Sequence, residues 1–325
     1  MGKEEHKIFT VSKILEVIDI KRIDKNRFRG LHVLNKPDTK SRGVYGGFIC
    51  AQALLAAFET VEESFKPHSL HSYFTSAGTE DVCFEYEVEE LVNGKSFVNR
   101  SVRAYQHGQL RYIIMISFTT KNSIEKTREL YVKDPTKPYP FEYQAPPSLR
   151  MVQHHPEALP PELSKGAGAL EHRFPPDYFD PALSPNENFK SAGERDVGYW
   201  LRLMSNNAGF SRRLKYCAAA VMSDSLQLVS FARVLHLPMS DITTGVSGGK
   251  GPYYFNVSVD HSVYFHDDDF DPSDFIYLSI QVPRFVNNRG MFQGGMFRKD
   301  GKRFASMVQE ALIFFHSGSE HKAKL

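Results

Sequence analysis

A repeated motif constrains the fold of this chain more than any other feature. The segment LHSYF at residues 70–74 recurs as DHSVYF at 260–265, and the two histidines, His71 and His261, lie 190 residues apart. After each copy, apolar residues alternate along a stretch (82–88 and 276–282), and a turn ending in glycine follows at 107–108 or 300–301. Alternation predicts strands, and the turns predict hairpins. A helical pattern precedes each copy, so the sequence predicts an α+β unit duplicated in tandem.

The second of these predicted helices carries a charge where none is expected. The stretch CAAAVMSDSLQLVSFARVL, residues 217–235, has apolar residues at helical spacing, which predicts one helix with a buried stripe. Asp224 falls on that stripe. Because a buried charge is costly unless it is paired, its position there needs a reason beyond packing.

The composition limits the classes of function. A chain of 325 residues with 41% hydrophobic content is long enough for two ordinary cores. Its 40 basic and 38 acidic residues nearly balance, which does not favour a nucleic-acid or anionic-membrane partner. The cysteines, Cys50, Cys83 and Cys217, form no CxxC pair, so we expect no disulfide framework and no zinc site. No apolar run approaches the roughly 20 residues that span a bilayer, so we expect a soluble protein.

The domain organisation follows from the repeat. We expect an N-terminal unit at 1–120, a proline-rich linker or insertion at 121–197, and a C-terminal unit at 198–325. The middle segment holds 12 of the 18 prolines, and proline removes a backbone donor and disfavours regular structure. A connector is the simpler interpretation of this segment, and an interaction surface is the alternative.

Six short motifs, in order, resemble the type II acyl-CoA thioesterases, the bacterial thioesterase II and its peroxisomal relatives: YGGFICAQAL, HSLHSYF, NGKSF, MSDSL, VDHSVYFH and MVQEA. The resemblance covers about residues 10–120 and 195–318. It implies a double hotdog fold, in which each of two tandem units wraps a curved antiparallel sheet around a central helix. It also implies hydrolysis of fatty acyl-CoA to free fatty acid and CoA, without a cofactor.

Three polar residues match the positions at which this family holds the attacking water: Asp224, Ser258 and Gln309. Gln309 shares its predicted strand face with apolar neighbours such as Met307, so it is also expected to be buried. Thioester hydrolysis needs a base beside a water, and Asp224 can accept the proton while Gln309 and Ser258 orient the water. Burial is expected to raise the pKa of Asp224, which makes it a better base.

The first copy of the repeat lacks this set. The sequence offsets align Gln52, His68 and Ile116 of the first copy with Asp224, Ser258 and Gln309 of the second. We therefore expect one site per chain. Gly46 and Gly47 open the first predicted helix, where free backbone N–H groups are suited to holding an oxyanion or carbonyl. Glycines needed only for close packing are the alternative.

Other charged or nucleophilic residues are weaker candidates. Arg212, Arg213 and Lys215 precede the second helix and are candidates for CoA phosphate contacts, with a solvated basic edge as the alternative. Ser247 completes a G-x-S-x-G pattern, but the strand and helix that a nucleophile elbow needs are absent from the pattern around it. The His154-His155 pair and HDDDFD at 266–271 match no metal spacing, so we expect no metal.

The chain ends in Ala323-Lys324-Leu325, which resembles the Ser-Lys-Leu peroxisomal address. Together with the expected chemistry, this tripeptide predicts location in the peroxisomal matrix and recognition by the peroxisomal import receptor. The resemblance also implies a homo-oligomer.

Two alternatives to a thioesterase remain. A hotdog-fold enoyl-CoA hydratase would need a histidine paired with an aspartate on the active helix, and the first histidine after Asp224 is His236. A non-catalytic acyl-CoA-binding or scaffold protein would use the middle segment as its contact surface.

Overall fold

The computed structural model describes residues 16–37, 41–163, 170–204, 210–237 and 253–316. Ser247 and the predicted targeting tripeptide Ala323-Lys324-Leu325 lie outside the described residues.

The N-terminal half is built around one buried helix, α2 (Gly46–Phe58). Its strands are β1 (Ile20–Asp24), β2 (Arg27–Gly30), β3 (Lys66–Phe74), β4 (Glu85–Asn93), β5 (Phe97–Gln106) and β6 (Gln109–Thr119). The predicted turn at His107-Gly108 joins β5 to β6, and both residues have positive φ, 51° and 70°, as a tight hairpin turn requires. The predicted hairpin is confirmed.

The C-terminal half repeats this plan around α5 (Arg212–Ser223), with α6 (Ser230–Val234) after it. Its strands are β9 (Val197–Leu203), β10 (Tyr253–Ser258), β11 (Asp260–Phe265), β12 (Ile276–Val286), β13 (Arg289–Arg298) and β14 (Arg303–His316). The apolar residues predicted to alternate into the core, Ile276, Leu278, Ile280 and Val282, are all buried.

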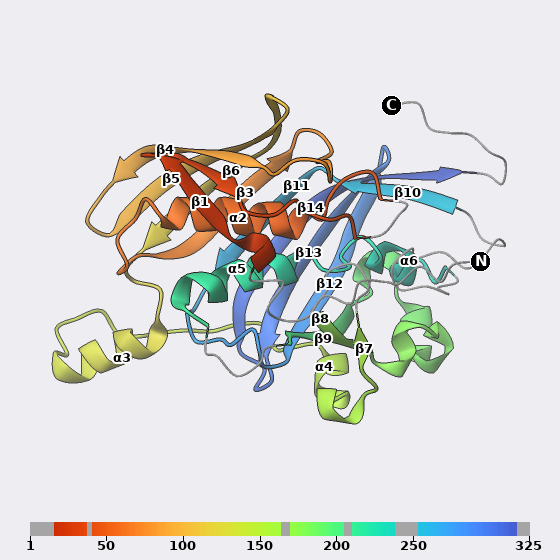
Figure 1. The fold of residues 1–325 in the computed structure, drawn as a ribbon. Coiled ribbons are helices and arrows are strands. Elements are labelled where there is room, and N and C mark those ends of the chain that lie inside the picture. The colour runs from red at the N-terminus through yellow and green to blue at the C-terminus, as the bar shows by residue number, and fades with distance from the viewer. Residues whose placement is uncertain (1–15, 38–40, 164–169, 205–209, 238–252, 317–325) are drawn as a thin grey trace.

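The two halves share one sheet. Within the described residues, 14 strands run in the order β1-β2-β4-β5-β6-β3-β11-β14-β13-β12-β9-β8-β7, with β10 paired to β14; β7 (Glu162–Leu163) and β8 (Leu170–Arg173) come from the middle segment. The antiparallel pairing of β3 with β11 joins the halves. Helices α2 and α5 pack against each other, enclosed by this curved sheet (Figure 1). The predicted double hotdog is confirmed.

The second helix is shorter than predicted. Instead of running through 217–235, α5 ends at Ser223, Asp224 is its C-cap, and a turn follows before α6 begins at Ser230. Short polar side chains compete for backbone hydrogen bonds, and Oγ of Ser223 lies 2.9 Å from the carbonyl oxygen of Ala220. Leu226 then takes a positive φ of 52°. The apolar spacing continues across the turn because its side chains still pack inward.

The two repeated histidines, 190 residues apart in the sequence, face opposite sides of the sheet. The structure pairs His71 with Ser262 and His261 with Ser72. His71 is exposed, whereas His261 is 1% exposed and faces the core. Successive strand residues point to opposite faces, so an alignment that is off by one residue exchanges the two faces.

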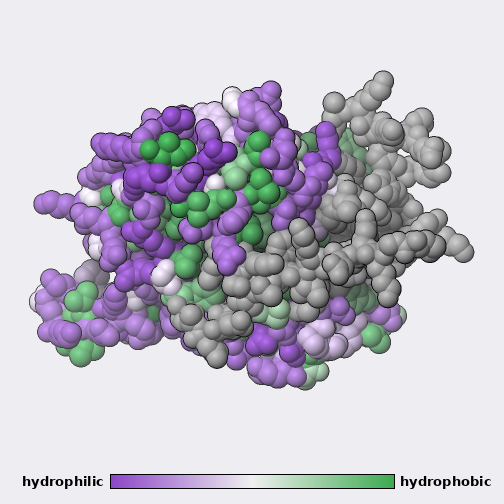
Figure 2. Space-filling view, in the orientation of Figure 1, coloured by the Kyte–Doolittle hydropathy of each residue, from purple (hydrophilic) through white to green (hydrophobic). Residues whose placement is uncertain are grey.

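The middle segment contains more structure than its prolines suggest. It includes α3 (Ile124–Lys133), α4 (Leu149–Gln153), β7 (Glu162–Leu163), β8 (Leu170–Arg173) and 3-10 turns at Pro156–Ala158, Pro176–Tyr178, Pro181–Leu183, Pro185–Phe189 and Ala192–Glu194. β8 pairs with β9 and extends the sheet. α3 has no buried residue and projects from the body (Figure 1), and hydrophobic side chains lie on its surface (Figure 2).

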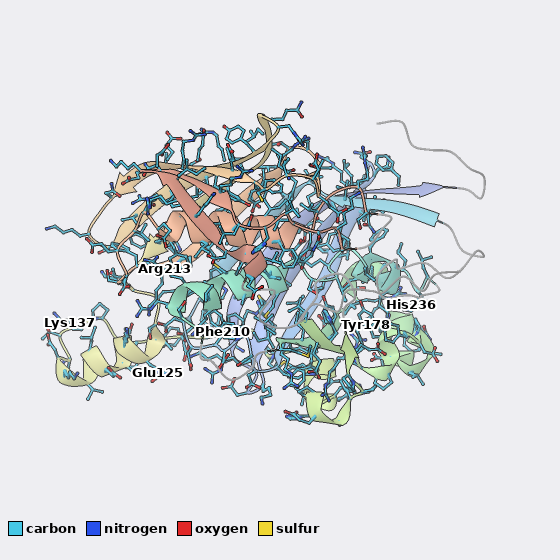
Figure 3. All side chains as sticks on the ribbon, in the orientation of Figure 1. Glu125, Lys137, Tyr178, Phe210, Arg213 and His236 are labelled. Carbon is cyan, nitrogen blue, oxygen red and sulfur yellow. The ribbon has the colours of Figure 1, made fainter. Side chains whose placement is uncertain are left out.

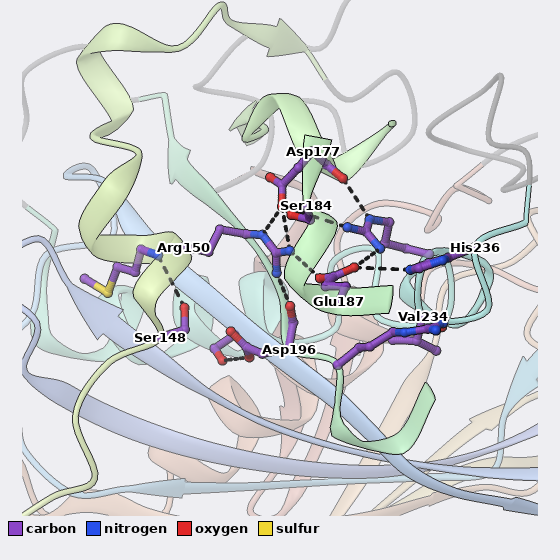
Figure 4. A network of polar contacts seen from close by, with 12 residues as sticks. Ser148, Arg150, Asp177, Ser184, Glu187, Asp196, Val234 and His236 are labelled. Atoms are coloured by element: carbon purple, nitrogen blue, oxygen red, sulfur yellow. Dashed lines mark hydrogen bonds and ion pairs between the residues drawn. The ribbon is translucent and has the colours of Figure 1, made fainter. Parts of the chain in front are cut away.

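A buried ion cluster fixes this segment to α6 (Figure 4). Arg150 donates to Asp177 at 2.8 Å and to Glu187 at 2.5 Å, and Arg233 of α6 donates to the other oxygen of Glu187 at 2.8 Å. Arg233 is only 1% exposed. Buried charges are tolerated when they are paired in this way, and removing one partner would leave the others uncompensated. The segment is therefore anchored beside the turn that follows Asp224.

Within the described ranges, no helix is both long and apolar enough to cross a membrane.

Candidate active site

Asp224 lies where the two halves meet. As the C-cap of α5 it reaches the first turn of α2, where the backbone N–H of Gly47 donates to its carboxylate. A Cβ atom on Gly46 would lie 2.9 Å from Oδ2 of Asp224 and 2.8 Å from Cζ of Phe74. Both distances are too short for a side chain, so only glycine allows this approach. The carboxylate thus belongs to the C-terminal half, but the N-terminal half forms part of its surroundings.

The structure brings the three predicted catalytic residues together. Gln309 is fully buried in β14, and its Nε2 donates to Oδ1 of Asp224 at 3.2 Å and to Oγ of Ser258 at 2.6 Å. Ser258 is the last residue of β10, which pairs with the same strand. A helix end and two neighbouring strands therefore present a carboxylate, an amide and a hydroxyl to one point.

The surroundings make Asp224 a good base. Burial raises the pKa of Asp224 from its usual 3.8 to about 7, against the opposing effects of the Gln309 and Gly47 hydrogen bonds. Its place at the carbonyl end of α5 also disfavours the negative form, because the helix dipole is negative there. A pKa near the operating pH is best suited to taking up and returning a proton.

Gly46 and Gly47 begin α2, as predicted. In this arrangement the N–H of Gly47 is directed at Asp224. This places an α2 donor beside the carboxylate, so a thioester carbonyl bound next to Asp224 would lie close to the positive end of α2.

Groups that the sequence analysis missed hold the turn around Asp224. Ser223 and Ser225 flank it, and both are buried. Nε2 of His261 lies 2.8 Å from Oγ of Ser223, and Nε2 of His172 lies 2.8 Å from Oγ of Ser225. The signal in the sequence was the pair of serines in MSDSL, each of which needs a polar partner once the turn is buried.

His172 comes from β8, so the middle segment contributes to this support. The hydroxyl of Tyr199, on the neighbouring strand β9, donates to the carbonyl of Ser225. Burial lowers the pKa of His172 to about 4, so its ring is neutral at physiological pH. The segment expected to be a connector therefore contacts the residue next to Asp224.

The three predicted CoA contacts lie at the far end of α5. Arg213 is near its first turn, beside the N-terminal half (Figure 3), and forms an ion pair with Glu59 at 2.5 Å. Arg212 donates to the carbonyl of Glu63, and Lys215 to that of Asp268. The 12 residues of α5 span about 18 Å, so Arg212 is a helix length away from Asp224, and Lys215, nearer along the helix, is about 13–14 Å away.

The residues of the first copy that the sequence offsets align with the catalytic set have structural roles. The amide of Gln52 donates to the carbonyl of Val17 at 2.7 Å and accepts from the hydroxyl of Tyr86 at 2.6 Å. His68 contacts Ser117 at 2.9 Å, and Ile116 is buried in the core.

The weaker metal candidates do not form a site. Among the residues that the structure describes, no group of three or more histidine, cysteine or acidic side chains is arranged to hold an ion. In the acidic segment 266–271, Asp267 pairs with Lys302 at 2.7 Å, and Asp268 and Asp269 are also paired with cations.

The fold and this site define a class, the hotdog-fold thioester hydrolases, and comparison with known proteins identifies the family. The model of the acyl-CoA thioesterase N-terminal domain matches residues 36–120, and that of the C-terminal domain matches 149–313. The chain belongs to the type II acyl-CoA thioesterase family, as the motifs predicted. The second match begins inside the proline-rich segment.

Relatives match along most of their length. The chain is 28% identical to peroxisomal acyl-coenzyme A thioester hydrolase 1 of Saccharomyces cerevisiae, covering 87% of this chain and 89% of the yeast protein. It is 27% identical to human acyl-coenzyme A thioesterase 8, covering 92% and 88%. Among solved structures, acyl-CoA thioesterase II TesB2 of Mycobacterium marinum has a TM-score of 0.70 at 25% identity, covering 94% of this chain and all of that one.

Proposed function

We propose that this enzyme hydrolyses fatty acyl-CoA with a water molecule held by Asp224, Ser258 and Gln309. The observation that carries the assignment is the pair of hydrogen bonds from Gln309, 3.2 Å to Asp224 and 2.6 Å to Ser258. Asp224 takes a proton as the water oxygen attacks the thioester carbonyl. The carbon–sulfur bond then breaks, and the CoA sulfur receives that proton. Free fatty acid and CoA leave, and Asp224 is again a carboxylate.

Of the two glycines predicted to bind the carbonyl oxygen, Gly47 already donates its N–H to Asp224, so the N–H of Gly46 is the proposed donor as the oxygen becomes negative. Their helix end faces the carboxylate across the junction of the halves, and such preorganised donors stabilise developing charge. Arg212, Arg213 and Lys215 are the proposed contacts of the CoA phosphates. To reach these cations with its thioester at Asp224, CoA would have to extend along α5.

Release of free thiol from a panel of acyl-CoAs tests this function. We expect stoichiometric CoA and fatty acid from saturated acyl-CoA. Hydration of an enoyl-CoA without thiol release would favour the hydratase alternative, and tight binding without turnover would favour the scaffold. The structure disfavours the hydratase, because His236 is bonded to Glu187 at 3.2 Å in the ion cluster rather than to Asp224.

We propose that the enzyme acts in the peroxisomal matrix and reaches it through the import receptor that reads Ala323-Lys324-Leu325. The name of the yeast relative supports this location. Deleting Leu325 from a protein tagged at its N-terminus should leave it in the cytosol. Punctate localisation of the deleted form would exclude the tripeptide as the address.

We also propose that the chain forms a homo-oligomer. Because the hotdog pairing is satisfied within one chain through β3 and β11, a further copy must use another surface. A mass of 37.0 kDa by light scattering, which is that of a single chain, would contradict this proposal and leave the proposed catalytic mechanism unaffected.

A further inference from the structure

A buried histidine lies behind the proposed catalytic amide. His261 lies on β11, is 1% exposed and has Nε2 2.8 Å from Oγ of Ser223. Within the described part of the chain, its other ring nitrogen, Nδ1, has no hydrogen-bond partner of good geometry. The side chain of Gln309 lies close enough to the ring to influence its pKa by hydrogen bonding.

In the described part of the structure, the amide of Gln309 lacks a hydrogen-bond donor to its oxygen, just as the ring of His261 lacks a partner for Nδ1. The amide nitrogen of Gln309, Nε2, faces Asp224 and Ser258, the two groups that are proposed to hold the water together with it. Its oxygen, Oε1, is buried and has no partner of good geometry among the described residues. A buried amide oxygen needs a donor, because leaving it unpaired loses the hydration that water would supply. A proton on Nδ1 of His261 would supply that donor.

A hydrogen bond from Nδ1 of His261 to Oε1 of Gln309 would also fix the direction of the neighbouring hydrogen bonds. With its proton on Nδ1, the ring accepts at Nε2 from the hydroxyl of Ser223, which then directs its single proton at the ring instead of at the carbonyl of Ala220. The opposite tautomer would direct the Nδ1 lone pair at the Gln309 oxygen, and the amide would then turn over to offer its N–H groups to the ring. A turned amide would present oxygen to Asp224, where two acceptors repel each other.

We propose that His261 is a positioning residue that sets the orientation of the Gln309 amide, so that its N–H groups face Asp224 and Ser258. The proposal rests on the function proposed above. It predicts that the ring acts as a neutral hydrogen-bond donor and never as a base. Consistent with this, burial lowers the pKa of His261 to about 4, so the ring carries a single proton at neutral pH.

The pH profile gives a readout that simple loss of packing would not move. The other titratable groups that sense the Asp224 charge are Tyr45, Cys50, Tyr112 and Tyr199, and burial raises the pKa of each. These four therefore stay neutral between pH 5 and about 9. The acid limb of kcat/KM reports Asp224. The hydrogen bond from Gln309 lowers the pKa of Asp224. Loss of this bond therefore raises that pKa and moves the acid limb to higher pH.

Two substitutions at His261 separate positioning from packing. His261→Phe keeps the ring volume but cannot donate, and we expect kcat to fall about tenfold, with KM unchanged and the acid limb displaced to higher pH. His261→Asn offers an amide N–H near the place of Nδ1 and should restore most of kcat and the original limb. His71→Phe, at the exposed histidine of the repeat, is the matched control and should change neither.

Measurement on the unmodified protein keeps the proposal testable if a variant fails to fold. The nitrogen chemical shifts of ¹⁵N-labelled histidine distinguish the two neutral tautomers, and we expect His261 to carry its proton on Nδ1 from pH 5 to 8. A proton on Nε2, or an unshifted acid limb in folded His261→Phe, would overturn the proposal. Failure of the proposed function is distinct, because Asp224→Asn would then retain activity whatever His261 does.

Discussion

The two halves are built on one plan, yet their central helices use polar residues differently. α2 continues without a break through Gln52, whose amide is bonded at both ends to groups of its own half, Val17 and Tyr86. α5 ends at Ser223, and its C-cap, Asp224, has partners that come from a strand and from the other half. A buried polar group that the nearby fold fully satisfies stabilises that fold. A buried carboxylate with a raised pKa, at a junction, is instead available for chemistry.

The sharpest test of this difference is Asp224→Asn. The substitution keeps the shape of the side chain but removes the proton acceptor, so we expect turnover to fall by about 10² to 10⁴ while the protein stays folded. Thiol release per folded molecule, with the melting temperature measured alongside, checks both parts. Loss of melting temperature with activity retained would mean that Asp224 only braces the helix end.

Gln309→Ile makes the second half resemble the first, where the sequence offset places Ile116. It removes the donor to Asp224, and hydrogen bonds to charged groups are worth about 1.5–3 kcal/mol, so we expect turnover to fall about 10- to 100-fold. Combined with Asp224→Asn, the effect should be much less than the product of the two, because both residues act on one water. Ser258→Ala should cost less than Asp224→Asn. If the effects of Gln309→Ile and Asp224→Asn on turnover were additive, Gln309 would not act on the same water as Asp224.

The pH dependence distinguishes Asp224 from an ordinary carboxylate. With a pKa of about 7, kcat/KM should rise with pH to a plateau above neutrality and fall about tenfold per unit below it. A raised pKa means that folding favours the protonated form. The folding stability that Asp224 contributes is therefore fully present at a pH below its usual pKa of 3.8. It is lost as the pH rises through the folded-state pKa of about 7. An acid limb near pH 4 would contradict the assignment.

Gln52→Leu should have the smallest effect on catalysis and act on stability instead. It leaves the carbonyl of Val17 and the hydroxyl of Tyr86 without their partner, at a cost of about 1–3 kcal/mol in the free energy of unfolding. Activity per folded molecule should match the wild type. Denaturant unfolding followed by assay of the folded fraction makes this measurement.

The sequence predicted what depends on periodicity and motif, and missed what depends on contacts across the fold. The duplicated unit, the hairpin turn at His107 and the meeting of Asp224 with Gln309 follow from local pattern and family motifs. The end of α5 at Ser223 did not, because its apolar spacing continues through a turn. The burial of His261 was also missed, since a shift of one residue in alignment changes the face of a strand. His172 and the ion cluster of Arg150 depend on long-range pairing that no local pattern encodes.

The pairing of β3 with β11 inside one chain has a consequence for how such a protein can change over generations. In a pair of identical chains, every substitution appears in both copies, so a residue cannot be gained on one side and lost on the other. Joining the copies in one gene removes that symmetry. Gln52 and Asp224 can then follow separate histories: one copy keeps its helix unbroken, and the other gives up helical turns to place a carboxylate. The two copies are inherited together, but each is free to acquire residues that the other lacks.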